Sequence, residues 1–277
     1  MDDGIVENVM PAETRKEIDK PHTLRTIYKK LYFKYIDLKD RKYTKQIGVD
    51  PLPPALLRYA VHNAIDIDSF LEVGKKCRDD IVGALKMIDR DMFSFSEVLD
   101  FGIGCGRTLR WFSDHPDSTH FYGTDIDPDA ISWCNEHLKF AFFSVNNPLP
   151  PLKYPSEMFD LIYSISVITH LSEDYQFKWL EELNRVTKPG GIVLLSFHGP
   201  NSFVTLLDKY KYSDELERKG FIFILHKNRA GLFPEWYQAA FHTLEYIYEN
   251  FPRYFNILEY VPGGMNVTQD LLILEKN

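Results

Sequence analysis

A glycine-rich turn with an acidic residue just before it is the first place in the sequence that could bind a ligand. A short apolar run is followed by Gly102, Gly104 and Gly106, which let the backbone approach a ligand closely. A dinucleotide-binding loop would carry its third glycine at position 107, where Arg107 stands and where we expect a helix to begin. The carboxylate of Asp100 suits a positively charged ligand, such as an ammonium group, and would repel a pyrophosphate.

A second acidic residue, Asp125, follows the next apolar run, 25 residues after Asp100. At the tip of the neighbouring strand a carboxylate can accept hydrogen bonds from both hydroxyls of a ribose. The alternative role is to cap a helix, but Asp127 directly before Pro128 is the better candidate for that. We therefore predict that Asp125 binds a nucleoside.

Three histidines, His170, His198 and His242, could act as a general base. His170 and His198 follow the ends of two predicted strands, where α/β proteins place their chemistry, whereas His242 lies in a later segment. The alternative for each is an ordinary satisfied or solvent-facing side chain. His170 and Glu173 have the spacing of two metal ligands on one helix face. No third ligand follows at a diagnostic spacing, so we predict no metal.

These residues need a sheet to bring them together. From residue 96 onward, short apolar runs alternate with helical segments, which predicts a mostly parallel sheet with crossover helices on both faces. Two final strands around the Pro262-Gly263-Gly264 turn predict an antiparallel hairpin at the sheet edge. The expected fold is Rossmann-like α/β with seven strands. The expected strands are Glu97–Phe101, His120–Thr124, Phe140–Val145, Phe159–Ile165, Gly191–Phe197, Phe255–Val261 and Thr268–Leu274.

The sequence resembles the class I S-adenosylmethionine-dependent methyltransferases in four motifs that follow one another in order. The turn Lys188-Pro189-Gly190-Gly191 is not expected in nicotinamide-dependent dehydrogenases. A looser resemblance is to bacterial methyltransferases of glycan and secondary-metabolite gene clusters. It runs through residues 52–61 and 166–171 and through a C-terminal pattern of Trp236-Tyr237, His242 and Gln269-Asp270. The four motifs are LDFGIGCGR at 99–107, GTDID at 123–127, VNNPLPPL at 145–152 with FDLIYSISV at 159–167, and ELNRVTKPGG at 182–191.

The resemblance implies S-adenosylmethionine as the cofactor and gives several residues a role in holding it. Asn146 stands where many relatives carry an aspartate, and its amide carbonyl can accept the same hydrogen bond from the adenine amine. The implied contacts are Asp100, Gly102 and Gly104 with the methionine end, Asp125 with the ribose, Ile126 and Asn146 with the adenine, and Ser164 and Ser166 beside the transferred methyl group.

The methyl acceptor is predicted from chemistry rather than from a motif. Methyl transfer is an in-line displacement that depends mainly on alignment, but a hydroxyl is a poor nucleophile at neutral pH and benefits from a base. We predict O-methylation of a saccharide or a similar small metabolite, with His170 as the base and His198 as the second choice. The alternatives are an N- or C-methyltransferase and a non-catalytic S-adenosylmethionine-binding scaffold. A nicotinamide dehydrogenase is disfavoured by Asp100 and the glycine spacing.

The chain divides into four predicted segments. Within its N-terminal part, residues 22–46 and 55–90 are expected to be helical. Asp50–Pro54 separates the two stretches, because its prolines favour an extended connector that cannot continue a helix. The many aromatic residues within 200–255 either stack on a flat acceptor such as a sugar or form a local core. The predicted segments are an acidic tail at 1–20, a helical extension at 21–95, a cofactor-binding core at 96–199, and a substrate cap with the last two strands at 200–277.

Composition excludes several classes of function. The 277 residues carry a net charge of −8, which argues against binding nucleic acid. We find no apolar run long enough to span a membrane, and no secretory signal. The three cysteines, Cys77, Cys105 and Cys134, have neither disulfide nor zinc spacing, so a reducing cytoplasm fits best.

In contrast to the acidic chain as a whole, residues 21–46 are strongly basic and rich in aromatic residues. It could dock on a membrane surface or on a partner, or it could pack on its own acidic domain with its lysines in solvent. We favour packing on the domain. The apolar stripe expected to make that contact consists of Leu24, Tyr28, Leu31, Tyr35 and Leu38.

Overall fold

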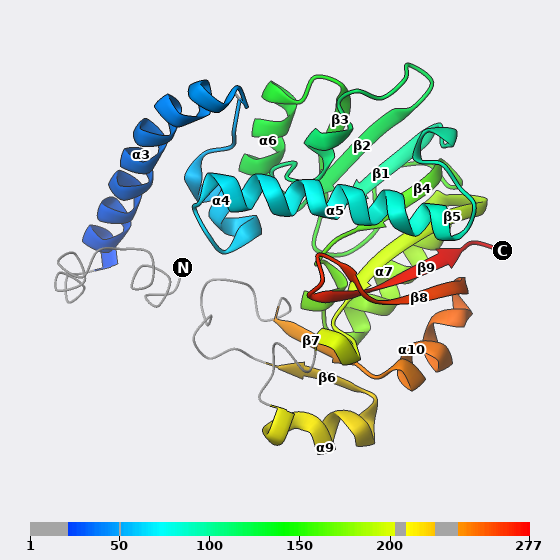
Figure 1. The fold of residues 1–277 in the computed structure, drawn as a ribbon. Helices are drawn as coiled ribbons and strands as arrows, with labels where there is room; N and C mark the ends of the chain where they lie inside the picture. Colours follow the sequence, from blue (N-terminus) through cyan, green and yellow to red (C-terminus); the bar gives the residue numbers. More distant parts are fainter. Residues whose placement is uncertain (1–21, 50, 203–208, 225–237) are drawn as a thin grey trace.

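A computed structural model gives the fold for residues 22–49, 51–202, 209–224 and 238–277 (Figure 1). The predicted acidic tail at 1–20 lies outside the described residues. So do Phe233, Trp236 and Tyr237 of the aromatic-rich segment. Among the described helices, none is both long enough and apolar enough to cross a membrane.

A seven-stranded sheet forms the centre of the molecule, with the strand order β3-β2-β1-β4-β5-β9-β8. The first five strands pair in parallel, β9 is antiparallel to β5, and β8 pairs with β9 as an antiparallel hairpin at the edge. The predicted Rossmann-like sheet is confirmed. The strands are β1 Glu97–Phe101, β2 His120–Asp125, β3 Ala141–Val145, β4 Phe159–Ser164, β5 Thr187–Phe197, β8 Asn256–Met265 and β9 Gln269–Glu275.

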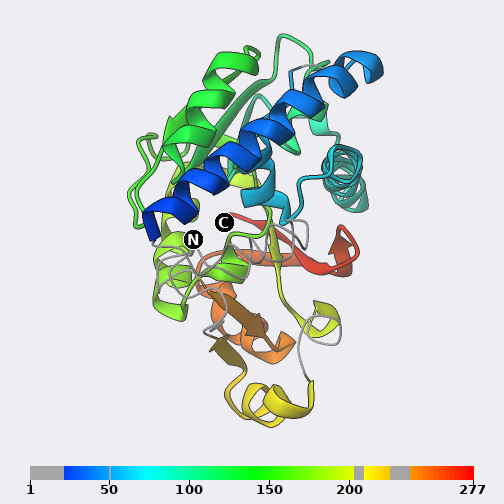
Figure 2. The same cartoon turned by 90° about the vertical axis from the view of Figure 1, so that its left-hand side faces the viewer.

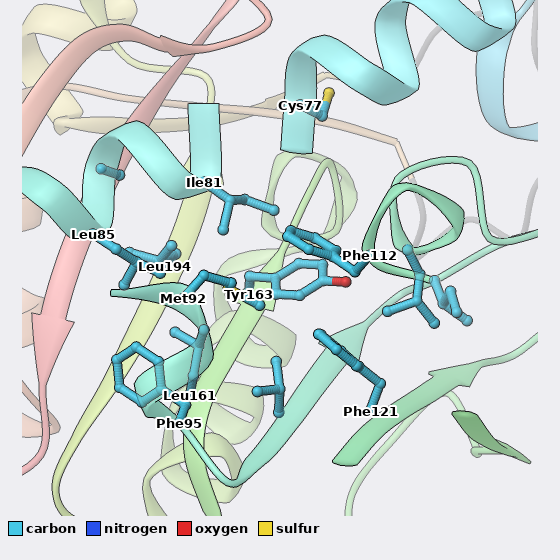
Figure 3. Close-up of a cluster of buried hydrophobic side chains, with 14 of the residues drawn as sticks. Cys77, Ile81, Leu85, Met92, Phe95, Phe112, Phe121, Leu161, Tyr163 and Leu194 are labelled. Carbon is cyan, nitrogen blue, oxygen red and sulfur yellow. The ribbon is translucent and has the colours of Figure 1, made fainter. Parts of the chain in front are cut away.

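Side chains of the central strands alternate between two hydrophobic cores, one on each face of the sheet. Along β4, Leu161 and Tyr163 enter the first core and Ile162 enters the second, as the two-residue period of a strand requires. Figure 3 shows the first core, in which Ile81 and Phe112 lie close to Tyr163. The first core takes in α5 Ile67–Met87, η1 Met92–Ser94, η2 Leu109–Phe112 and α6 Pro128–His137; the second takes in α7 Glu173–Val186, α10 Leu244–Asn250 and η5 Phe251–Arg253.

The N-terminal part contains three α-helices within the residues that the structure describes. Helix α3 His22–Ile47 confirms the first predicted helix. The second predicted helical stretch, 55–90, is divided into two helices, because α4 Ala55–His62 ends at Asn63, which has a φ of 56°. Helix α5 then begins afresh, with the Asp66 side chain accepting a hydrogen bond from the Ser69 amide at 2.7 Å. Figures 1 and 2 show α3 on the outside of the molecule, next to α4.

Two details of the C-terminal part differ from expectation. Strand β8 runs through the predicted Pro262–Gly264 turn, and the chain reverses at Asn266 and Val267, both of which have positive φ. The described part of the predicted cap also contains a second, two-stranded sheet, formed by β6 Phe221–Ile224 and β7 Ala239–His242. Helix α9 Lys209–Lys219 precedes this sheet, and β7 lies against the short helix η3 Ile168–His170 that follows β4.

Candidate active site

The glycine loop after β1 has a backbone that only glycine adopts easily. Gly102 and Gly104 have φ values of 83° and 55°, in the left-handed region. A Cβ on Gly102 would lie 2.1 Å from Val167 Cγ2, and one on Gly104 would lie 2.4 Å from Val61 Cγ1. The loop is therefore a tight cradle, closed by Val167 after β4 and by Val61 of α4.

No α-helix begins at Arg107, contrary to the prediction. Residues 102–108 form turns, and the short helix η2 follows. The arginines here hold the N-terminal segment to the loop instead. Arg107 Nη1 donates to the Val61 carbonyl at 3.0 Å, and Arg110 Nη2 donates to the Pro51 carbonyl at 2.7 Å. The loop is thus fixed by α4 and its connector rather than by the first turn of a following helix.

Asp125 lies at the tip of β2 beside the glycine loop. Its Oδ2 accepts a hydrogen bond from the Gly104 amide at 2.7 Å, and its Oδ1 accepts one from the Asp127 amide at 2.9 Å. Burial raises the pKa of this carboxyl, while these two hydrogen bonds favour its charged form. Asp127 is the N-cap of α6, as predicted, because its side chain accepts from the amides of Asp129 and Ala130. Ile126 between them is 40% exposed, so its side chain remains accessible to a ligand.

Asp100, the penultimate residue of β1, is almost completely buried. Burial raises its pKa to about 8, and the nearby charge of Asp125 acts in the same direction. A carboxyl in this condition is mostly protonated at neutral pH, and a cation placed beside it would favour the charged form. The site therefore suits a positively charged group such as an ammonium.

The other predicted cofactor contacts lie at the same edge of the sheet. The Thr124 hydroxyl lies 2.9 Å from Asn146 Oδ1, an oxygen that has a second lone pair for another donor. Ser164, the last residue of β4, is buried, and its hydroxyl has no hydrogen-bond partner within the part of the chain that the structure describes. A buried hydroxyl without a partner and a cradle that a Cβ would fill both fit a bound S-adenosylmethionine.

Ser166 belongs to a closed ring of three hydrogen bonds between the ends of β4, β5 and β9. Its amide donates to Ser196 Oγ at 2.8 Å, Ser196 Oγ donates to Gln269 Oε1 at 2.7 Å, and Gln269 Nε2 donates back to Ser166 Oγ at 2.7 Å. The ring holds Ser166 at a φ of 61°. Sequence reasoning missed Ser196, although a hydroxyl within an otherwise apolar strand was a usable signal.

His170 and His198 come together at this edge. Their ring centroids are 6.2 Å apart. His170 Nδ1 lies 2.6 Å from the carbonyl oxygen of Gln238, and His198 Nδ1 lies 3.1 Å from that of Ala240. A carbonyl oxygen only accepts, so each Nδ1 carries a proton and Nε2 is the basic nitrogen of the neutral ring. The segment that orients both rings includes β7, which the sequence did not predict.

His242 has a structural role instead. It is fully buried, and burial lowers its pKa to about 3, so the ring is neutral. Its Nε2 pairs with Gln176 Oε1 at 2.8 Å, and Gln176 Nε2 donates to the carbonyls of Ile168 and Leu171 at 3.0 Å. This buried pair ties β7 to the turn that carries His170. Sequence reasoning missed Gln176, whose only signal was an amide on the buried face of a helix.

The possible metal pair is engaged in other contacts. Glu173 Oε1 accepts a hydrogen bond from the Tyr246 hydroxyl at 2.5 Å, while His170 Nδ1 faces the Gln238 carbonyl. Within the described ranges, no group of three histidine, cysteine, aspartate or glutamate side chains could hold a metal ion.

Residues 99–195 match a family model described as a methyltransferase domain. These residues contain the end of β1, the glycine loop, Asp125, the turn with His170 and most of β5. This stretch of the chain is a methyltransferase domain. S-adenosylmethionine is the cofactor of this domain, and the match agrees with the cradle at Gly102 and the buried carboxyl of Asp100.

Comparisons with known proteins extend beyond this match. The chain is 30% identical over 129 residues to a phosphoethanolamine N-methyltransferase of Plasmodium falciparum, covering 46% of this chain and 44% of that protein. It is 38% identical over 104 residues to a tRNA (carboxymethyluridine(34)-5-O)-methyltransferase of Arabidopsis thaliana, covering 37% of this chain and 24% of that protein. The chain therefore spans less than half the length of these relatives.

Solved structures share the fold. The PH0226 protein of Pyrococcus horikoshii aligns with a TM-score of 0.51 at 18% identity, over 79% of this chain and 97% of that one. A chain from the complex between the Haloferax volcanii Trm112 methyltransferase activator and a methyltransferase also aligns with a TM-score of 0.51, at 14% identity, over 75% of this chain and 92% of that one. At these identities the likeness concerns the fold alone.

Proposed function

We propose that this protein transfers a methyl group from S-adenosylmethionine to a hydroxyl of a saccharide or a similar small metabolite. The observation that supports this most is the orientation of His170. Its Nδ1 donates to the Gln238 carbonyl, which leaves Nε2 as the basic nitrogen, and His198 is held in the same way by Ala240. Two oriented bases at neighbouring strand ends suit an acceptor that must lose a proton.

In this proposal the residues of the chain bind the cofactor, orient the acceptor and remove the proton of its hydroxyl. S-adenosylmethionine, when bound, supplies a methyl group on an activated sulfonium. Asp125 accepts hydrogen bonds from the ribose hydroxyls, and Asp100 faces the ammonium group. His170 Nε2 accepts the proton of the acceptor hydroxyl as the new carbon–oxygen bond forms. Val167 links the cofactor site to the proposed base, because it contacts the glycine loop and stands three residues before His170.

A cavity beside this turn supports a saccharide as the acceptor. It has a volume of about 590 Å³, and Glu173, three residues after His170, contributes to its wall. Sugars bind through aromatic faces that cover their apolar sides and through polar groups that pair with their hydroxyls. The cavity offers both kinds of group. It is lined by Glu173, Tyr212, Glu215, Lys219, Phe221, Ile222, Phe223 and Ile224.

Nitrogen methylation is the second candidate, and the similarity to a phosphoethanolamine N-methyltransferase favours it. An amine with a lone pair is already a nucleophile, so a base contributes less to its methylation. The two candidates therefore differ in how strongly turnover depends on His170. A carbon acceptor or a non-catalytic scaffold has no comparable observation in its favour.

The setting proposed for the reaction is the cytoplasm. All three cysteines, Cys77, Cys105 and Cys134, are free and buried, as expected of a protein that folds in a reducing compartment. The net charge of −8 speaks against a nucleic acid as the acceptor, although one relative is a tRNA methyltransferase.

The test is to supply the protein and methyl-labelled S-adenosylmethionine to a small-molecule extract and to find labelled products by mass spectrometry. We expect a labelled methyl ether of a hydroxylated metabolite. The His170→Ala variant should form it far more slowly, whereas His120→Ala, a change at an exposed histidine, should not. A labelled amine formed equally well by all three proteins would support the nitrogen candidate. No labelled product despite cofactor binding would contradict both candidates.

A further inference from the structure

Helix α3 has two faces of opposite character over residues 31–47. One face is fixed to the domain: Phe33 is buried, with its ring centroid 6.2 Å from that of Tyr59. Asp37 Oδ1 accepts a hydrogen bond from the Ala55 amide at 2.7 Å, at the start of α4. Asp40 forms an ion pair with the buried guanidinium of Arg58. Both acidic residues of this stretch are thus engaged with the domain.

The opposite face contains the apolar stripe that we expected to pack on the domain. That expectation is wrong, because Leu31, Tyr35 and Leu38 are 57%, 55% and 63% exposed. The physical reason is that Phe33 and the two engaged aspartates make the contact with the domain. Leu24 and Tyr28 of the predicted stripe lie outside the side chains that the structure describes.

Lysines surround the exposed part of the stripe. At 3.6 residues per turn, Lys34, Lys42 and Lys45 share with it roughly a third of the helix circumference. All three are exposed. No acidic side chain lies on this face within residues 31–47, since Asp37 and Asp40 are on the other one. The face is therefore apolar along its middle and cationic at its margins, on a chain whose net charge is −8.

We propose that this outward face of α3 docks the protein on an anionic lipid surface. Leucine and tyrosine side chains enter the headgroup region of a bilayer, while lysines extend their ammonium groups to the anionic headgroups. Because the rest of the chain is acidic, attraction to such a surface is confined to α3 and orients the protein on it. The docking concerns a surface outside the active site and does not depend on which acceptor is methylated.

A second copy of the chain fits this face less well. The spacing of Leu31, Tyr35 and Leu38 is that of a coiled-coil seam, which two copies could in principle share. The residues beside the seam are Lys34, Lys39 and Arg41. In a parallel pair, like charges would face one another across the seam and repel. Anionic lipid removes this conflict, because it supplies the opposite charge along the whole length of the face.

The experiment measures sedimentation of the full chain with vesicles of phosphatidylcholine alone and with vesicles that contain 30% phosphatidylserine. We expect binding to the anionic vesicles only, weakening as salt is raised. Replacing Lys34, Lys42 and Lys45 with glutamine should weaken it by about 100-fold, since each basic residue near such a surface contributes roughly 1 kcal/mol, or about fivefold.

Two control variants test whether a loss of binding comes from this face of α3 rather than from a change in net charge or in the stability of the fold. Replacing three exposed lysines outside α3, Lys75, Lys86 and Lys153, changes the net charge equally and should leave binding close to the wild type. Leu31→Ser with Leu38→Ser should weaken binding, whereas Met87→Ser, also at an exposed position, should not. No binding of the wild type, or equal loss in both lysine variants, would overturn the proposal. Dimerisation that Leu38→Ser abolishes, with no vesicle binding, would assign the face to a second copy instead.

Discussion

The imidazole rings of His170 and His198 lie edge to face, with their centroids 6.2 Å apart and an interplanar angle of 84°. His198 directly follows β5, and His170 ends η3, which follows the neighbouring parallel strand β4. The carbonyls of Gln238 and Ala240 orient the two rings. The two rings are therefore held by a segment far away in the sequence. This arrangement supports base catalysis at this edge of the sheet, next to the cofactor cradle.

Loss of His170 should reduce turnover while leaving cofactor affinity nearly unchanged. General base catalysis contributes about 10²–10⁴-fold, so His170→Ala should lower kcat by that factor with the labelled acceptor. His120→Ala is the control. Near-normal turnover in His170→Ala would shift the role to His198 or to alignment alone. Loss of wild-type activity on adding a chelator would instead indicate a metal.

Removing the charge of Asp125 should weaken S-adenosylmethionine binding. Hydrogen bonds to a charged group contribute about 1.5–3 kcal/mol, so Asp125→Asn should raise the Kd about 10- to 100-fold in calorimetry. Asp127→Asn removes the same charge two residues away, and asparagine is itself a good helix N-cap. Equal affinity losses in the two variants would mean that general electrostatics, rather than a ribose contact, is responsible.

Asp100 should make cofactor binding release a proton. In the unliganded protein its pKa is raised to about 8, so at pH 7 the carboxyl is mostly protonated. An ammonium beside it lowers that pKa, and the proton leaves as the complex forms. Affinity should therefore rise with pH up to about 8 and then level off.

Calorimetry in two buffers with different ionisation enthalpies measures this release. We expect up to about one proton at pH 7 and much less at pH 9, where the carboxyl is already ionised. Asp100→Asn should abolish the release, whereas Asp127→Asn should keep it. Release of the same size from the Asp100→Asn protein would place the titrating group elsewhere.

The cradle at Gly102 should not tolerate a side chain. Gly102→Ala combines a left-handed φ of 83° with a contact of 2.1 Å to Val167 Cγ2. Gly190→Ala has a similar φ of 72° but open space around the new Cβ. The Gly190 variant should lose about 1–2 kcal/mol of stability from its backbone alone. Thermal unfolding should show a larger loss for the Gly102 variant, together with weaker cofactor binding. Equal losses in both would mean that the cradle is not tightly closed.

Local patterns in the sequence were sufficient for the sheet and for the residues at its edge. A strand buried on both faces appears in the sequence as a short apolar run, and polar residues near or just beyond its end lie at the carboxyl edge of the sheet. Asp100, Asp125 and His170 are found at that edge. The break at Asn63 was not predictable from periodicity, because the apolar spacing of α4 continues into α5. The contact between His170 and Gln238 joins residues 68 positions apart, and no local pattern encodes it.

Which face of α3 packs against the domain could also not be predicted from the sequence. The stripe through Leu31 and Tyr35 is the more apolar side of the helix, and burial of apolar surface would favour it as the contact. The ion pair of Asp40 with Arg58 and the capping of α4 by Asp37 select the other side. Such polar contacts depend on residues about 18 positions away, whose placement only the fold determines.

The most direct test of a methyltransferase function is the choice of cofactor by the purified full chain. Calorimetry with S-adenosylmethionine, S-adenosylhomocysteine and NAD measures that choice. We predict that the first two bind and raise the Tm by mass action, that Asp125→Asn weakens both, and that NAD neither binds nor stabilises the protein. Preferential binding of NAD, with no binding of S-adenosylmethionine or S-adenosylhomocysteine, would contradict the account.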